Sequence, residues 1–131
     1  NAKGAVHISG QGAVHINSKA QDDKSSVYSG NTVTISGQTI KNSTGAKIHS
    51  DKAMVLTAQT GLDNSGIITT NDALTTHSRT LNNAGTIQST SAITVNNQQG
   101  KVTNSGKIMA ILFIFKLFFV NHKTNITTRQ S

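Results

Sequence analysis

The apolar positions of this chain recur at a nearly constant interval. A first column of Ile and Val residues consists of Ile8, Val27, Ile48, Ile68, Ile87 and Ile108, and the steps between successive members are 19, 21, 20, 19 and 21. A second apolar column lies six positions further on and consists of Val14, Val33, Met54, Leu74, Ile93 and Ile114. A repeat of about 20 residues predicts a solenoid, in which each copy forms one rung and buries the rung beside it.

Within each copy, apolar and polar residues alternate with a period of two. Val14-His15-Ile16, Val33-Thr34-Ile35 and Ile93-Thr94-Val95 each place two apolar side chains on one side and a polar one on the other. This is the period of a β-strand, whereas an amphipathic helix needs spacings of three and four. The pattern predicts three short strands and three turns in each copy.

One phrase, apolar-x-Asn-small-Gly-x-Ile, occurs at Leu62–Ile68, Leu81–Ile87 and Val102–Ile108. In stacked rungs its asparagines would form a ladder of side-chain amides, and its glycines would supply the backbone conformation of a tight corner. These predicted corner residues are Asn64, Gly66, Asn83, Gly85, Asn104 and Gly106. Residues 1–110 are therefore predicted to form an all-β, right-handed parallel β-helix of about five to six rungs.

The composition changes after Ala110. Residues 111–131 begin with an apolar run that holds all four Phe of the chain and end in a polar tail. We expect the repeat to be interrupted here, by a shifted reading frame or an insertion. The alternatives are a cap over the open end of the helix and a membrane-associating segment. The apolar run is too short to span a bilayer, which needs about 20 residues.

Composition and charge exclude several kinds of site. The chain of 131 residues has no Cys, so it has neither a disulfide framework nor a thiolate metal site. Its net charge of +7 is spread along the sequence, and Tyr28 is the only aromatic residue in the predicted rungs, which argues against nucleic-acid binding. Lys41, Lys47 and Lys52 are the best candidates for contact with an anionic surface.

Neither catalysis nor cofactor binding is expected. Enzymes built on β-helices need clustered acidic and basic groups on one outer face. The acids here are scattered over Asp22, Asp23, Asp51, Asp63 and Asp72. The histidines fall on different walls of the predicted helix, so no metal pair is expected.

The repeated phrase, with its period, resembles the haemagglutinin repeats of the filamentous haemagglutinin and contact-dependent inhibition exoprotein family. The resemblance is best over Ile40–Ile108. It implies a long β-helical fibre, secreted through an outer-membrane two-partner secretion transporter and displayed at the bacterial cell surface. It also implies adhesion to glycans or receptors on host or neighbouring cells, or presentation of a toxin, with no transmembrane span.

On this reading the chain is a structural and adhesive shaft segment and not an enzyme. Nothing in it resembles the family's secretion domain or a toxin. Two alternatives remain open at this stage: a carbohydrate-active β-helix enzyme, and a truncated fragment without function.

Overall fold

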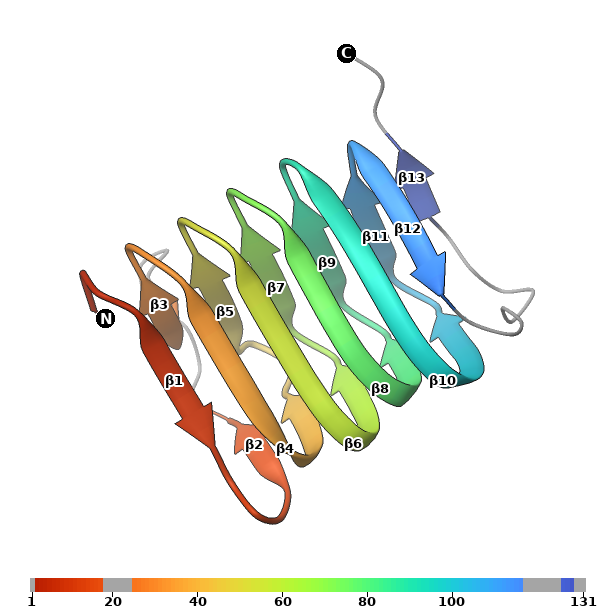
Figure 1. Ribbon diagram of the computed structural model, residues 1–131, viewed down its shortest axis with the longest axis horizontal. Coiled ribbons are helices and arrows are strands. Elements are labelled where there is room, and N and C mark those ends of the chain that lie inside the picture. Colours follow the sequence, from red (N-terminus) through yellow and green to blue (C-terminus); the bar gives the residue numbers. More distant parts are fainter. Residues whose placement is uncertain (1, 18–24, 117–125, 129–131) are drawn as a thin grey trace.

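The computed structural model describes residues 2–17, 25–116 and 126–128, and every regular element in them is a β-strand (Figure 1). The strands are β1 (Val6–Ser9), β2 (Val14–Ile16), β3 (Val27–Ser29), β4 (Val33–Asn42), β5 (Lys47–Ser50), β6 (Met54–Asn64), β7 (Ile67–Thr70), β8 (Leu74–Asn83), β9 (Thr86–Ser89), β10 (Ala92–Asn104), β11 (Lys107–Ala110), β12 (Leu112–Lys116) and β13 (Ile126–Thr128). In this part of the chain, no helix is long and apolar enough to cross a membrane.

The strands form two parallel sheets, and the chain passes from one to the other in each turn. The long-strand sheet has the order β1-β4-β6-β8-β10-β12, with β2 also paired to β4. The short-strand sheet has the order β13-β11-β9-β7-β5-β3. Figure 1 shows the two sheets as two layers, with β1 and β3 at one end of the stack and β12 and β13 at the other. The predicted all-β parallel β-helix is therefore confirmed.

The number of turns is smaller than predicted. About four turns are complete, each made of one long and one short strand: β4–β5, β6–β7, β8–β9 and β10–β11. The remaining strands pair onto the two ends of this stack. Three short strands were predicted in each turn, but the first two form one long strand with a bend near its middle. At the bend the pairing with the neighbouring strand shifts in register, as between Thr57 and Gly61, and then continues.

Register places the same kind of side chain at the same point of every turn. Val33, Met54, Leu74 and Ile93 form one buried column of the long-strand sheet. Ile48, Ile68, Ile87 and Ile108 form the corresponding column of the short-strand sheet. A third buried column, beyond the bend, consists of Ile40, Leu62, Leu81 and Val102. These columns fill the interior between the two sheets.

The first predicted rung is out of register with the structure. Ile8 was predicted to open a rung in the column of Val27, but it pairs with Ile35 in the long-strand sheet. Val6, and not Val14, lies in register with Val33. The sequence contains Val-His-Ile twice in close succession, and both copies have the strand period. Periodicity alone could not decide which copy enters which position.

The strand pairing continues beyond Ala110, where the composition changes. Phe113 pairs with Ile93, so it takes the column position that was predicted for Ile114. Ile114 instead pairs with Thr94, and its side chain is 39% exposed. Strand β13 continues the short-strand sheet by pairing with β11. The change in composition therefore does not mark the end of either sheet, while residues 117–125 and 129–131 lie outside the described chain.

The interior contains two hydroxyl groups without hydrogen-bond partners in the described structure, on Thr76 and Ser78. Thr76 is 1% exposed and stands in register with Leu56 and Val95, in an otherwise apolar column. Leaving a buried polar group unpaired costs about 1–3 kcal/mol. This single threonine therefore lowers the stability of the stack.

We predict that Thr76→Val raises the free energy of unfolding by about 1 kcal/mol, because it replaces an unpaired hydroxyl with a methyl group of similar shape. Urea unfolding followed by far-UV circular dichroism measures the change. Thr75→Val is the matched control, since Thr75 is only half-buried, and it should change stability by less than about 0.5 kcal/mol. A destabilised Thr76→Val variant would contradict the prediction.

Candidate functional site

The asparagines of the repeated phrase form a hydrogen-bonded ladder inside the β-helix. Each side-chain amide nitrogen donates to the amide oxygen of the next asparagine, from Asn42 to Asn64 (2.9 Å), Asn64 to Asn83 (2.8 Å) and Asn83 to Asn104 (2.7 Å). All four side chains are at most 2% exposed. The ladder therefore begins one turn earlier than the three sequence copies indicate.

Each amide nitrogen also satisfies backbone carbonyls at the corner. The amide of Asn64 donates to the carbonyl oxygens of Gly66 (3.1 Å) and Thr86 (3.0 Å). The amide of Asn83 does the same for Gly85 (3.1 Å) and Lys107 (3.0 Å). One side chain thus joins its own turn to the next, so the phrase has a structural role.

The glycines of the phrase are needed for a different reason from the one predicted. Gly45, with φ of 87°, is the only described glycine with a positive φ. Gly66, Gly85 and Gly106 instead lie against the backbone of the preceding turn. A Cβ added to any of them would come closer than 3.0 Å to a carbonyl oxygen there, that of Ala46, Gly66 or Gly85 respectively. These corners require glycine because the stacked backbones leave no room for a side chain.

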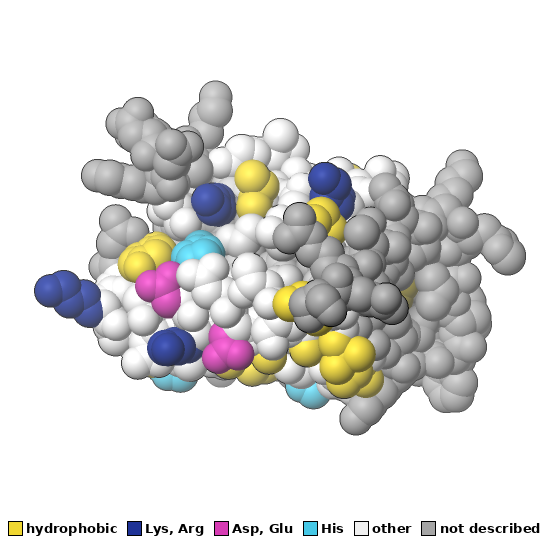
Figure 2. Space-filling model, turned by 90° about the horizontal axis from the view of Figure 1, so that it is seen from above, with side chains coloured by type: hydrophobic (Ala, Val, Ile, Leu, Met, Phe, Trp, Pro, Cys, Tyr) yellow, Lys and Arg dark blue, Asp and Glu magenta, His cyan; other side chains and the backbone are white. Residues whose placement is uncertain are grey.

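The three lysines proposed for anionic contact do not share one corner. Lys41 near the end of β4 and Lys47 at the start of β5 flank one turn, whereas Lys52 lies beyond the far end of β5. Lys41 is also in register with Asp63 on the neighbouring strand. Figure 2 shows the charged side chains of one face spread out, with both signs present. The described lysines therefore do not form a concentrated basic patch.

The acids are equally dispersed in the described residues. Asp63 accepts a hydrogen bond from Asn82 (2.8 Å), and Asp72 accepts one from the backbone of Ala73 (2.8 Å). Asp22 and Asp23 lie outside the described chain. In the part that the structure describes, no three His, Asp, Glu or Cys residues are arranged to hold a metal ion.

One group of hydrogen-bonded polar side chains was not predicted from the sequence. On the outer side of the short-strand sheet, Asp51 accepts hydrogen bonds from the Tyr28 hydroxyl (2.8 Å) and from His49 Nε2 (3.0 Å). His49 Nδ1 contacts the Thr69 hydroxyl (2.7 Å), and its ring stacks on Tyr28 with 5.8 Å between centroids. Tyr28, His49 and Thr69 occupy one register position on three neighbouring strands. The sequence signal was the shared place of Tyr28, His49 and Thr69, each one residue after a member of the first apolar column.

The hydrogen bonds of this group shift two pKa values. The pKa of Asp51 is lowered, first because the Tyr28 hydroxyl donates to its carboxylate and second because His49 does. The pKa of Tyr28 is raised, chiefly because its proton is held by Asp51. Asp51 is the one carboxyl in the group, whereas glycoside hydrolysis ordinarily needs two. The arrangement is suited to stabilising the sheet surface.

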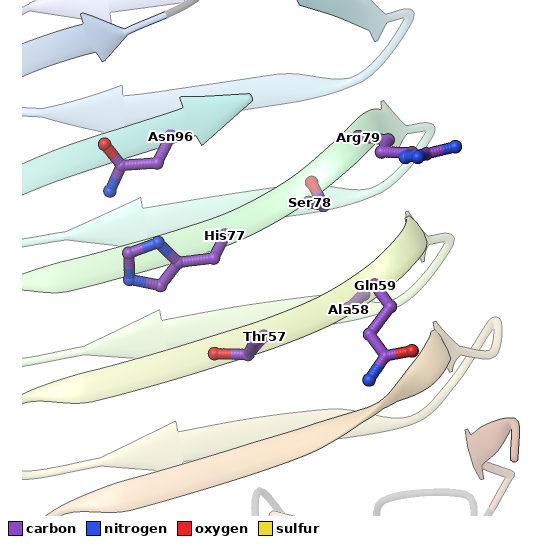
Figure 3. A pocket seen from close by; sticks show the side chains of 7 residues that line it. All are labelled: Thr57, Ala58, Gln59, His77, Ser78, Arg79 and Asn96. Carbon is purple, nitrogen blue, oxygen red and sulfur yellow. The ribbon is translucent and has the colours of Figure 1, made fainter. Parts of the chain in front are cut away.

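A hollow of about 330 Å³ lies at the bend of the long-strand sheet, over β6, β8 and β10. Its polar lining consists of Thr57, Gln59, His77, Arg79 and Asn96, with Ala58 and Ser78 between them (Figure 3). None of the residues singled out from the sequence for ligand contact lies in it. This hollow is a candidate binding site formed by described residues.

Comparison with known proteins identifies no relative. The sequence matches no protein-family model and no curated protein, and the structure matches no solved structure. The resemblance to haemagglutinin repeats therefore remains a prediction from the sequence.

We predict that Asn83→Ala lowers the free energy of unfolding by about 3 kcal/mol, because it removes the buried amide's hydrogen bonds to Asn104, Gly85 and Lys107 and leaves a cavity in the stack. Urea unfolding provides the measurement. Asn82→Ala is the matched control: Asn82 is adjacent but exposed, so the loss should be below about 0.5 kcal/mol. Equal effects of the two substitutions would show that the ladder contributes little.

A second prediction concerns pH. Because the folded pKa of Asp51 is lowered, its contribution to stability is present above its unfolded pKa and is lost as pH falls through the folded pKa. Tyr28→Phe removes the hydroxyl whose hydrogen bond is the main cause of the lowered pKa of Asp51. The pKa of Asp51 should therefore move upward, as measured by NMR titration of its carboxyl carbon. The stability difference between wild type and variant should shrink as the solution becomes acidic. Thr75→Val, on the other sheet, should leave the Asp51 pKa unchanged; an unchanged value in Tyr28→Phe would refute the assignment.

Proposed function

We propose that this chain is a rigid, non-enzymatic shaft segment of a secreted, filamentous haemagglutinin-like bacterial exoprotein. The full-length protein would be exported through an outer-membrane two-partner secretion transporter. At the cell surface it would mediate adhesion to glycans or receptors, or present a toxin. The observation that carries this proposal is the continuous asparagine ladder through the stacked turns.

The ladder supports a shaft because it uses the most conspicuous motif of the sequence entirely inside the stack. Asn42, Asn64, Asn83 and Asn104 are buried, and their amides bond to one another and to backbone. Such a motif gains its full set of hydrogen bonds only when turn follows turn. Repetition of this kind favours length and stiffness over a single binding pocket.

One observation favours the alternative of a carbohydrate-active enzyme. In the group formed by Tyr28, His49, Asp51 and Thr69, an acid, an imidazole and a hydroxyl are linked in sequence by hydrogen bonds. Activated nucleophiles use a similar order of groups. None of these four side chains lines the hollow at the bend. We therefore rank this function second.

Two measurements on the intact chain separate the possibilities. Surfaces coated with the chain should retain several-fold more epithelial cells than surfaces coated with Leu74→Asp, which places a charge in the buried column. Incubation with neutral and acidic polysaccharides should release no new reducing ends and no unsaturated uronate.

Each contrary result has a definite meaning. Polysaccharide cleavage that disappears in Asp51→Asn would overturn the proposal in favour of the enzyme. Absence of both cell attachment and cleavage, in a chain whose circular dichroism is that of strand, would overturn the adhesive role and favour a fragment without function.

A further inference from the structure

The hollow at the bend exists because neighbouring turns have unequal lengths there. Two buried columns flank the bend, and the number of residue steps between them differs from strand to strand. It is eight in β6 (Met54 to Leu62), seven in β8 (Leu74 to Leu81) and nine in β10 (Ile93 to Val102). The columns stay in register, and a shift in strand pairing at the bend on each side of β8 takes up the difference in length. The shorter β8 lies between the two longer strands, and the hollow is at this point.

The polar side chains of the hollow form two rows along the stacking direction. Thr57, His77 and Asn96 are in register on three adjacent strands. Gln59 and Arg79 each lie two residues further toward the bend, as Figure 3 shows. The small residues between the rows form the floor. The result is a short trough that crosses three turns.

Within the described part of the chain, the polar side chains that line the trough are not engaged with one another or with neighbouring groups. Thr57, Gln59, His77, Arg79 and Asn96 make no side-chain hydrogen bond to any other described group. Elsewhere on the surface, polar side chains pair across the strands, as Asp63 does with Asn82 and Asp51 with Tyr28. Unpaired donors and acceptors along the walls of a hollow can serve as a site for a polar ligand.

The chemistry of the trough selects an acidic ligand rich in hydroxyl groups. Among the described residues that line it, Arg79 carries the one permanent charge and none has a carboxylate. A guanidinium binds a carboxylate through two parallel hydrogen bonds. The amides of Gln59 and Asn96, on the turns to either side, can both donate to and accept from hydroxyl groups. Along the trough, a cationic side chain therefore lies between two neutral amides.

We propose that this trough binds an extended saccharide lying along the stacking direction, with the carboxylate of one acidic sugar on Arg79 and neutral sugars over Gln59 and Asn96. Stacked turns are about 4.8 Å apart, and a linked pyranose has a similar length, so one sugar corresponds to one turn. The inference rests on the proposed adhesive function and specifies its ligand class. It also places the contact at the bend instead of at Lys41, Lys47 and Lys52.

The test is an NMR titration of the isotopically labelled full chain with a hyaluronan hexasaccharide, which alternates glucuronate with N-acetylglucosamine. Saturable shifts are expected at residues 57–59, 77–79 and 96, with Kd of about 1 mM for so open a site. Arg79→Gln should weaken binding about tenfold, because it removes a charge-assisted contact. Lys41→Gln, an exposed cation away from the hollow, is the matched control and should change Kd less than twofold.

Neutral chitohexaose should bind at least tenfold more weakly than the acidic oligomer. Equal binding of the two sugars would overturn carboxylate recognition, and a loss of binding in Lys41→Gln but not in Arg79→Gln would overturn the location. Circular dichroism confirms that each variant is folded. No saturable shift with either sugar would overturn the saccharide site while the cell-attachment assay still tests the shaft, so the two proposals can fail separately.

Discussion

The structure depends on successive turns presenting the same kind of side chain at the same place. Side-chain amides stack only if asparagine follows asparagine, and apolar columns remain closed only if Ile, Leu, Val or Met recurs in register. The corner glycines show the same constraint in steric form, because the carbonyl of Gly66 lies where a side chain of residue 85 would be. Interior, corner and backbone spacing are thus fixed together, and a change in one turn is transmitted to its neighbours.

Much of the fold was predictable because residues that stack on adjacent turns are separated by a nearly constant number of residues in the sequence. The columns of Ile48 and Val33, the all-β parallel architecture and the asparagine corners all followed from the nearly constant interval between apolar positions. The first turn was placed wrongly because Val6-His7-Ile8 and Val14-His15-Ile16 fit a strand equally well. The C-terminal register was wrong by one residue because alternation in an almost wholly apolar run cannot show which face is buried.

The outer surface was far less predictable than the interior. Tyr28, His49 and Thr69 lie on successive turns and share no residue type, so only the register of the strands brings them together. The hollow left a signal of another kind. The steps of 19 to 21 residues along the apolar columns reflect the different numbers of residues at the bends of β6, β8 and β10. The steps alone do not show at which corner of the turn the extra residues lie. Interior positions repeat the same kind of residue from turn to turn and can therefore be recognised in the sequence. Surface positions carry different residue types, so their contacts depend on which residues lie beside them.

The asparagine ladder also has a direction. Each amide nitrogen points from one turn to the amide oxygen of the next, so the side-chain dipoles align and reinforce one another. At the first member, the Asn42 amide oxygen has no hydrogen-bond partner among the described residues, because Ile16 stands at the adjoining position of β2. The ladder thus begins abruptly, with its acceptor end against a hydrocarbon side chain. The two ends of the stack are therefore chemically different. The direction of the side-chain hydrogen bonds alone distinguishes one end of the β-helix from the other.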